Sequence, residues 1–301
     1  MSRKNIAKDF RANWPIYLLL LPVIIFFIVF SYVPMVGIVM AFQNYNMRLG
    51  IFGSEWVGLM HFRDFFGSHH FVRIIRNTFL ISFYGLLLFP APIIFALLLN
   101  ELRSLKFKRV IQTISYMPFF ITTVVFAALI RNFFSSTGAA TQIISFFGGP
   151  SGNLLGRADL FRPIFVGTGL WQTLGFSSII YVAALAGVDQ ELYEAARMDG
   201  ANRLRQTWHI TLPGIIPTIT ILLILNLGQL LNVGFERIIL LYGPATFETG
   251  DVIASFVYRR GLQEMNFSFG TAVGLFNSVV SLVLIIMANY GARKLGETSL
   301  F

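Results

Sequence analysis

Residues 191–213 read Glu-Leu-Tyr-Glu-Ala-Ala-Arg-Met-Asp-Gly-Ala-Asn-Arg-Leu-Arg-Gln-Thr-Trp-His-Ile-Thr-Leu-Pro, a polar stretch between two long apolar runs. Good helix formers fill Gln190 to Met198, which predicts a short helix. Gly200 can take the left-handed conformation that ends a helix, and a second, basic segment follows. Pro213 opens the next apolar run, as proline often does in a first helical turn. The stretch is therefore predicted to be a structured helical loop joining two long helices.

The rest of the chain has the composition of a membrane protein. Of its 301 residues, 55% are hydrophobic and 12% are charged, whereas soluble domains carry about 25% charged residues. Several runs reach the roughly 20 apolar residues that a membrane-spanning helix needs. We expect an all-α integral membrane protein with six transmembrane helices, at residues 15–41, 77–99, 110–130, 164–186, 213–233 and 271–290. They form one transmembrane domain, 15–291, with an N-terminal segment 1–14, an internal polar loop 187–212 and a tail 292–301.

The basic residues predict the orientation of this domain. An even number of spans places both termini on one side of the membrane. Residues 1–14, 100–109, 187–213 and the tail hold 13 Lys and Arg, against 10 in the three longer connections on the other side. Since cytoplasmic loops are enriched in Lys and Arg, we expect both termini and the loop 187–212 to be cytoplasmic. The net charge of +9 then reflects orientation and does not indicate a nucleic-acid partner.

Several functional classes are disfavoured by what the sequence lacks. The chain has no cysteine, which excludes disulfides and thiolate metal sites. His69 and His70 are adjacent in a polar loop, where a solvated pair is favoured over a metal site. There is no G-x-x-x-x-G-K-[ST] phosphate loop and no cluster of catalytic residues. We therefore expect no catalytic, cofactor or metal site in this chain.

The six apolar runs contain no Asp, Glu, Lys, Arg or His. Ion-coupled carriers usually need such a residue within the membrane, so energy is expected to enter elsewhere, and the cargo is expected to be uncharged and polar. An anionic cargo would call for basic residues along its path, and only Arg73 and Arg76 are expected near that path. The uncharged polar candidates for a substrate path are Asn226, Gln229, Asn232, Trp171, Gln172, Tyr181, Asn277 and Ser278. They would either bind sugar hydroxyls and rings or join helices by hydrogen bonds, and the sequence leaves both interpretations open.

The spacing within the cytoplasmic loop adds a family resemblance. Glu194-Ala195-Ala196, then Gly200, then Ile210-x-Leu-Pro213 resembles the EAA motif of permease subunits from binding-protein-dependent ABC importers. Residues 34–42 are similar to the carbohydrate branch of these permeases, and residues 241–253 to the subgroup that serves oligosaccharides from complex polysaccharides.

The resemblance implies a type I ABC importer permease fold in the bacterial cell membrane, importing a sugar or oligosaccharide. It implies four kinds of partner: a second permease subunit, two cytoplasmic subunits that bind ATP and Mg²⁺, an extracytoplasmic solute-binding protein, and the membrane lipids. The helix at 190–200 would couple transport to the ATPase through Glu194, Ala195, Ala196, Asp199 and Gly200. The alternatives are a permease for glycerol phosphate or another small solute, and a secondary carrier.

Overall fold

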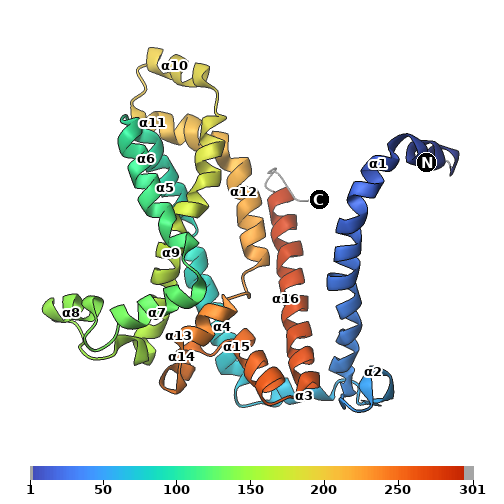
Figure 1. Ribbon diagram of the computed structural model, residues 1–301. Coiled ribbons are helices and arrows are strands. Elements are labelled where there is room, and N and C mark those ends of the chain that lie inside the picture. Colours follow the sequence, from blue (N-terminus) through green and yellow to red (C-terminus); the bar gives the residue numbers. More distant parts are fainter. Residues whose placement is uncertain (1–2, 295–301) are drawn as a thin grey trace. The chain divides into compact units, whose positions relative to one another are not determined.

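The computed structural model describes residues 3–294, so residues 1–2 of the expected N-terminal segment and 295–301 of the expected tail lie outside the described residues. The chain divides into two compact units. Their helices are labelled in Figure 1. One contains Met1–Gly67 and Val257–Leu275, and the other contains Ser68–Phe256 and Phe276–Phe301. The last helix, α16 (Phe267–Lys294), belongs in part to each.

The first unit is built on the N-terminal apolar helix and the segment that follows it. Its elements are α1 (Arg3–Phe27), a π-helical turn (Ile28–Tyr32), a 3₁₀ helix (Val33–Phe42), β1 (Gln43–Asn44), α2 (Gly50–Gly53), β2 (Glu55–Trp56), α3 (Met60–Gly67) and a second π-helical segment (Tyr258–Gln263). The two short strands pair antiparallel, Gln43 opposite Trp56. Ser268 accepts a hydrogen bond from the Tyr45 N–H at 2.9 Å, which ties the start of α16 to this unit.

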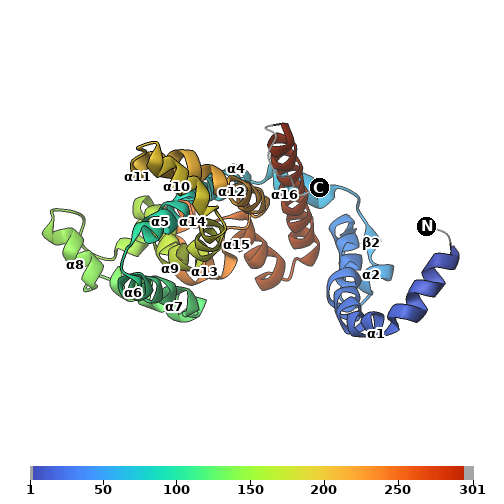
Figure 2. The ribbon, with the colours of Figure 1, turned by 90° about the horizontal axis from the view of Figure 1, so that it is seen from above.

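The second unit is a helical bundle. Its elements are α4 (Phe71–Leu87), α5 (Pro90–Glu101), α6 (Leu105–Tyr116), a 3₁₀ turn (Met117–Phe120), α7 (Thr123–Phe133), α8 (Ala139–Phe146), a 3₁₀ turn (Leu154–Gly156), α9 (Ala158–Ala186), α10 (Gln190–Met198), α11 (Arg203–Gln206), a π-helical turn (Thr207–Thr211), α12 (Leu212–Gly228), α13 (Phe235–Leu241), a 3₁₀ turn (Pro244–Thr246), α14 (Phe247–Gly250) and α15 (Ile253–Val257). The long helix α9 packs against α5, α6 and α12 (Figure 2).

Five described helices are long and apolar enough to cross a membrane. They are Ala12–Phe42, Phe71–Glu101, Ala158–Ala186, Arg203–Gly228 and Phe267–Gly291. A sixth candidate is the pair Leu105–Phe120 and Thr123–Phe133, which is bent by 101°. The six expected spans each overlap one of these segments, although the helices extend beyond most of the expected bounds.

Two expected spans differ in form from the structure. The third, 110–130, is not one straight helix: after Pro118 the chain is extended at Ile121 and Thr122 before α7 begins. Proline has no N–H to continue the helical ladder, which favours a break at such a position. The fifth, 213–233, stops being helical at Gly228. Gly234 then takes a left-handed φ of 60°, which turns the chain into α13.

Two apolar clusters hold the second unit together. One lies where α7 and α13 meet the first turns of α9 and includes the fully buried Phe126, Phe161 and Ile238. The other joins α5 and α12 to the last turns of α9 through Ala96, Leu185 and Ile215. Contacts from opposite ends of α9 therefore fix the helices that surround it.

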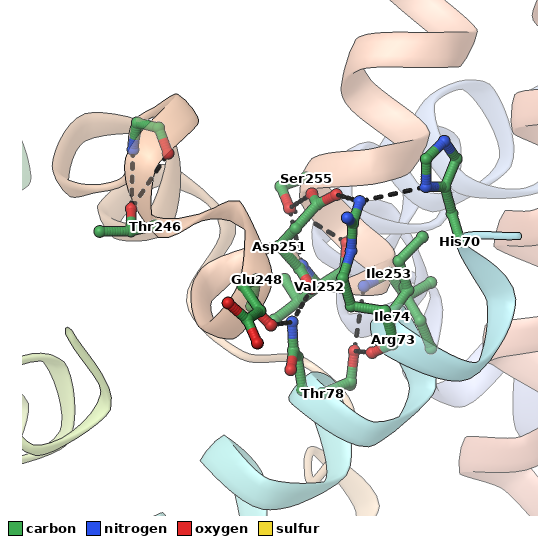
Figure 3. Close-up of polar contacts among 12 residues, drawn as sticks. His70, Arg73, Ile74, Thr78, Thr246, Glu248, Asp251, Val252, Ile253 and Ser255 are labelled. Atoms are coloured by element: carbon green, nitrogen blue, oxygen red, sulfur yellow. Dashed lines mark hydrogen bonds and ion pairs between the residues drawn. The ribbon is translucent and has the colours of Figure 1, made fainter. Parts of the chain in front are cut away.

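A buried polar cluster fixes the segment that contains α14 and α15 against α4 (Figure 3). Thr78 accepts a hydrogen bond from the Ile253 N–H at 3.0 Å, and Ser255 donates to the fully buried Asp251 at 2.9 Å. Arg73 lies 3.5 Å from the same carboxylate. Because buried polar groups must be hydrogen-bonded, this cluster specifies one position for the segment.

Candidate functional site: a polar cavity and an exposed helical loop

The second unit contains a cavity of about 870 Å³ between α4, α5, α9, α12 and α13. Most of its wall is apolar. Its polar groups are the amides of Asn226, Gln229 and Asn232, the hydroxyls of Ser82, Thr173, Ser177 and Tyr181, and the guanidinium of Arg237. Small-molecule sites commonly have this character, with about 300–1,000 Å³ of space, apolar walls and a few polar groups.

The three amides predicted from the fifth apolar run do come together at this cavity. Asn226 lies in the last turn of α12, and Gln229 and Asn232 lie in the non-helical chain that follows it. The Asn232 amide donates to the Gln229 side-chain oxygen at 3.0 Å, and all three side chains are exposed. Apart from this bond between Asn232 and Gln229, their exposed polar atoms can form hydrogen bonds with a molecule in the cavity.

The predicted residues of α9 separate into two groups. Tyr181 lines the cavity, although it is buried. Trp171 and Gln172 lie instead toward α7: the Trp171 ring is 5.5 Å from the ring of Phe126, and the Gln172 amide donates to the Ile121 carbonyl at 3.4 Å. These two residues contact the chain at and after the bend between α6 and α7. Their contacts fit the interpretation that they join helices, not that they bind a sugar.

Asn277 and Ser278, on α16, are not among the residues that line the cavity. The Asn277 side-chain oxygen is buried and makes no hydrogen bond within the described part of the chain. The structure therefore does not bring the α16 candidates together with the amides of α12.

Arg237 is the cavity residue that sequence reasoning missed. In the sequence, Arg237 is one charged residue in a polar connection between two expected spans. The expectation of an uncharged cargo did not take it into account. Its guanidinium carbon lies 4.0 Å from the centre of the Phe165 ring, and burial lowers the pKa of Arg237 to about 10, so it stays protonated at neutral pH. The sequence did contain one indication of this role: Arg237 stands immediately before the apolar residues 238–241.

At the opposite end of the second unit from α13, α14 and α15, the loop 187–212 forms two short helices (Figure 1). Asp189 caps α10 by accepting a hydrogen bond from the Glu191 N–H at 2.9 Å. Gly200 has a φ of +73°, and the Ala201 N–H donates back to the Ala196 carbonyl at 2.8 Å, which ends the helix. Asn202 then caps α11. The predicted helix, glycine break and second basic helix are all present.

The loop is attached to the bundle by hydrogen bonds on one side. Tyr193 donates to Thr211 at 2.9 Å, and Arg203 pairs with Glu101, at the end of α5, at 2.8 Å. A cavity of about 940 Å³ lies between these contacts. The other side of α10 is open, with Leu192 52% and Met198 89% exposed.

The predicted coupling residues lie on this open helix and at its end. Glu194, Ala195, Asp199 and Gly200 are exposed, and Ala196 is half-buried. Exposed apolar side chains on a well-capped helix form a surface suited to another protein. Elsewhere, no group of three His, Asp or Glu side chains within residues 3–294 is arranged to hold a metal ion.

Five or six candidate membrane spans, a cavity whose apolar wall carries several polar groups, and an exposed helical loop are features expected of a membrane transport protein. Residues 88–297 match the family model described as binding-protein-dependent transport system inner membrane component, and the chain belongs to that family. It is therefore a multi-pass inner-membrane permease subunit without a nucleotide site or cofactor of its own.

Relatives align along almost the whole chain. Protein LplB of Bacillus subtilis is 45% identical, over 97% of this chain and 92% of its own length. The polygalacturonan/rhamnogalacturonan transport system permease protein YteP of the same organism is 45% identical, over 100% and 94%. A bacterial ABC transporter involved in the import of the acidic polysaccharide alginate contains a chain with 43% identity and a TM-score of 0.89, covering 96% and 99%. The predicted importer-permease fold is confirmed.

Proposed function

We propose that this chain is one of two permease subunits of an ATP-driven importer of oligosaccharides derived from polysaccharides. The observation that carries the proposal is the cavity, where three amides and four hydroxyls converge within one bundle. Such groups form hydrogen bonds with sugar hydroxyls, and the apolar wall can contact sugar rings. The cargoes named for the similar transporters, polygalacturonan/rhamnogalacturonan and alginate, support the same substrate class.

The cargo path proposed here includes Asn226, Gln229, Asn232 and Tyr181. A second permease subunit completes it, and an extracytoplasmic binding protein delivers the cargo. The alginate transporter has been solved with a periplasmic protein that carries an alginate pentasaccharide, which supports this arrangement.

The loop 187–212 is the proposed cytoplasmic contact with the ATPase. Two observations support it: α10 is capped at both ends yet exposed, and the basic segment 102–109 lies at the same end of the bundle, joined through the Glu101–Arg203 ion pair. Two ATP-binding subunits would each dock one permease loop. Closure of the ATPase around ATP and Mg²⁺ would then move α10, and α9 and α12, which flank the loop, would carry that motion to the cavity.

The test is reconstitution of the intact complex, with its binding protein, in proteoliposomes. We expect oligosaccharides of a polysaccharide-degradation panel to stimulate ATP hydrolysis and to be taken up only when ATP is present. Uptake driven by a proton gradient without ATP, or stimulation by glycerol phosphate and not by any oligosaccharide, would overturn the proposal.

A further inference from the structure

Arg237 has a fixed place on the cavity wall. Gly234 ends the non-helical stretch with its left-handed φ, and α13 then places the Arg237 side chain against α9. The guanidinium lies over the Phe165 ring, and it fills the space beside Gly169, one helical turn later. A Cβ atom at Gly169 would lie 2.3 Å from Nη1 of Arg237. The sequence of α9 therefore leaves room for the guanidinium at this point.

Within residues 3–294, no acidic side chain pairs with the positive charge of Arg237. None of the ion pairs among the described residues includes Arg237, and its buried Nε makes no hydrogen bond there. Among the described residues that line the cavity, Arg237 is the one with a charged side chain. Arg237 is half-buried and its Nε is fully buried, so the guanidinium loses part of its hydration without gaining an anion. Such a loss is costly, and this geometry favours an anion from outside the chain.

The surroundings of Arg237 indicate the kind of anion. The nearby amides and hydroxyls are neutral and suit the hydroxyl groups of a sugar, while one arginine matches one negative charge. Arginine presents a planar fork of N–H donors that binds a carboxylate through two parallel hydrogen bonds. A phosphate ester, which carries up to two charges, would be less well matched because the cavity wall offers no second cation.

We propose that Arg237 binds the carboxylate of a uronic acid residue while the cargo passes through the cavity. This inference rests on the proposed function and makes it more specific: the permease itself distinguishes acidic from neutral oligosaccharides, in addition to any selection by the binding protein. The Phe165 ring holds the guanidinium plane, and the amides on the same wall bind the hydroxyls of the sugar.

The experiment compares two cargoes of equal length, an oligogalacturonate and its carboxyl-reduced, neutral counterpart. Each is supplied at a concentration that saturates the binding protein, and ATP-dependent uptake is measured with the reconstituted complex. For Arg237→Gln we expect the ratio of acidic to neutral uptake to fall about 10-fold or more, the loss associated with one charge-assisted hydrogen-bonded pair. Arg237→Lys, which keeps the charge without the fork, should lie between Arg237→Gln and the wild type.

A second variant tests the geometry without removing the charge. Gly169→Ala places a methyl group where the guanidinium lies and must displace it, so the acidic-to-neutral ratio should again fall. This variant keeps the proposal testable if Arg237→Gln fails to assemble. The control is Arg157→Gln, which removes an exposed arginine outside the cavity and should leave the ratio unchanged.

An equal loss of both cargoes in Arg237→Gln and Gly169→Ala would overturn the inference, since Arg237 would then serve assembly, for example by pairing with an acid of the second permease. An unchanged ratio in both variants would overturn it as well. Failure of the proposed function looks different: the wild-type complex would take up neither cargo in the presence of ATP.

Discussion

Arg162 donates a hydrogen bond to the side-chain oxygen of Asn77 at 2.7 Å, while the amide nitrogen of Asn77 donates to the carbonyls of Glu248 and Asp251, each at 3.0 Å. Asn77 is fully buried. Through this one amide, α4 is joined both to the second turn of α9 and to the chain around α14. Asn77 therefore adds to the contacts of Thr78 and Arg73 that fix the segment containing α14 and α15 against α4.

Asn77→Ala should lower the stability of the second unit by about 2 kcal/mol or more, because it leaves buried donors and acceptors without partners. The measurement is the thermal midpoint of the purified complex in detergent. Asn132→Ala, an exposed asparagine on α7, is the control and should change the midpoint little. Equal midpoints for the two variants would show that the Asn77 network does not stabilise the fold.

Two glycines of α9 should respond in opposite directions to the same substitution. A Cβ atom at Gly175 would lie 2.2 Å from the Ser115 carbonyl oxygen, so Gly175→Ala must separate α6 from α9. Gly167 has no neighbour within 4 Å of such an atom, and Gly167→Ala gains helix propensity, by up to about 1 kcal/mol. We expect a lower thermal midpoint for Gly175→Ala and an equal or higher one for Gly167→Ala. A lower midpoint for Gly167→Ala would contradict the prediction.

The left-handed conformation of Gly200 predicts a graded effect on coupling. A Cβ at this position would meet no atom within 4 Å, so only backbone strain matters. Asn tolerates this conformation better than a β-branched residue does. Gly200→Val should therefore reduce the cargo transported per ATP hydrolysed, and Gly200→Asn should stay close to the wild type. Equal coupling in the two variants would mean that the turn does not define the position of α10.

The exposed face of α10 should not tolerate a new negative charge if the ATPase docks there. We expect Ala195→Glu to abolish cargo-stimulated ATP hydrolysis while leaving the permease in the membrane. The matched control is Ala139→Glu, which changes an exposed alanine on α8, at the other end of the bundle from α10. Normal stimulation in Ala195→Glu, measured in proteoliposomes, would remove α10 from the proposed docking surface.

Gln229 tests the contribution of the amides to the path. Gln229→Leu removes a hydrogen-bonding group from the cavity and leaves Asn232 without its 3.0 Å partner. We expect a lower maximal uptake rate or a changed oligosaccharide preference. Gln142→Leu, at an exposed position on α8, serves as the control. Wild-type transport kinetics for Gln229→Leu would return the residue to a helix-packing role.

Local signals were sufficient for the loop and for the existence of the spans. Asp189, Gly200 and Asn202 act on neighbouring backbone groups, so their roles as caps or helix breaks depend on a few adjacent residues. Apolar length likewise indicates a membrane helix without reference to its neighbours. The caps, the helix break and the apolar spans were therefore predictable, because each depends on residues within a short stretch of the chain.

Features with tertiary causes were not predictable in the same way. The side of α9 on which Trp171 lies is decided by contact with Phe126 of α7. The end of α12 at Gly228 coincides with a close approach of Ile285, whose Cγ1 would lie 2.7 Å from a Cβ there. Arg237 becomes a cavity residue only because Gly169, much earlier in the chain, leaves space for it. These contacts join residues far apart in the chain, so a pattern within one stretch of the sequence does not predict them.

The contact between Gly169 and Arg237 also constrains how such permeases can diverge. If a side chain appears at position 169, the arginine must be replaced by a shorter residue or move. If the arginine is lost, a cavity remains that a larger residue at position 169 can fill. The two positions should therefore change together during evolution. Single-step intermediates would carry either a steric clash or an empty space at this place, so a well-packed variant without the arginine would need both substitutions.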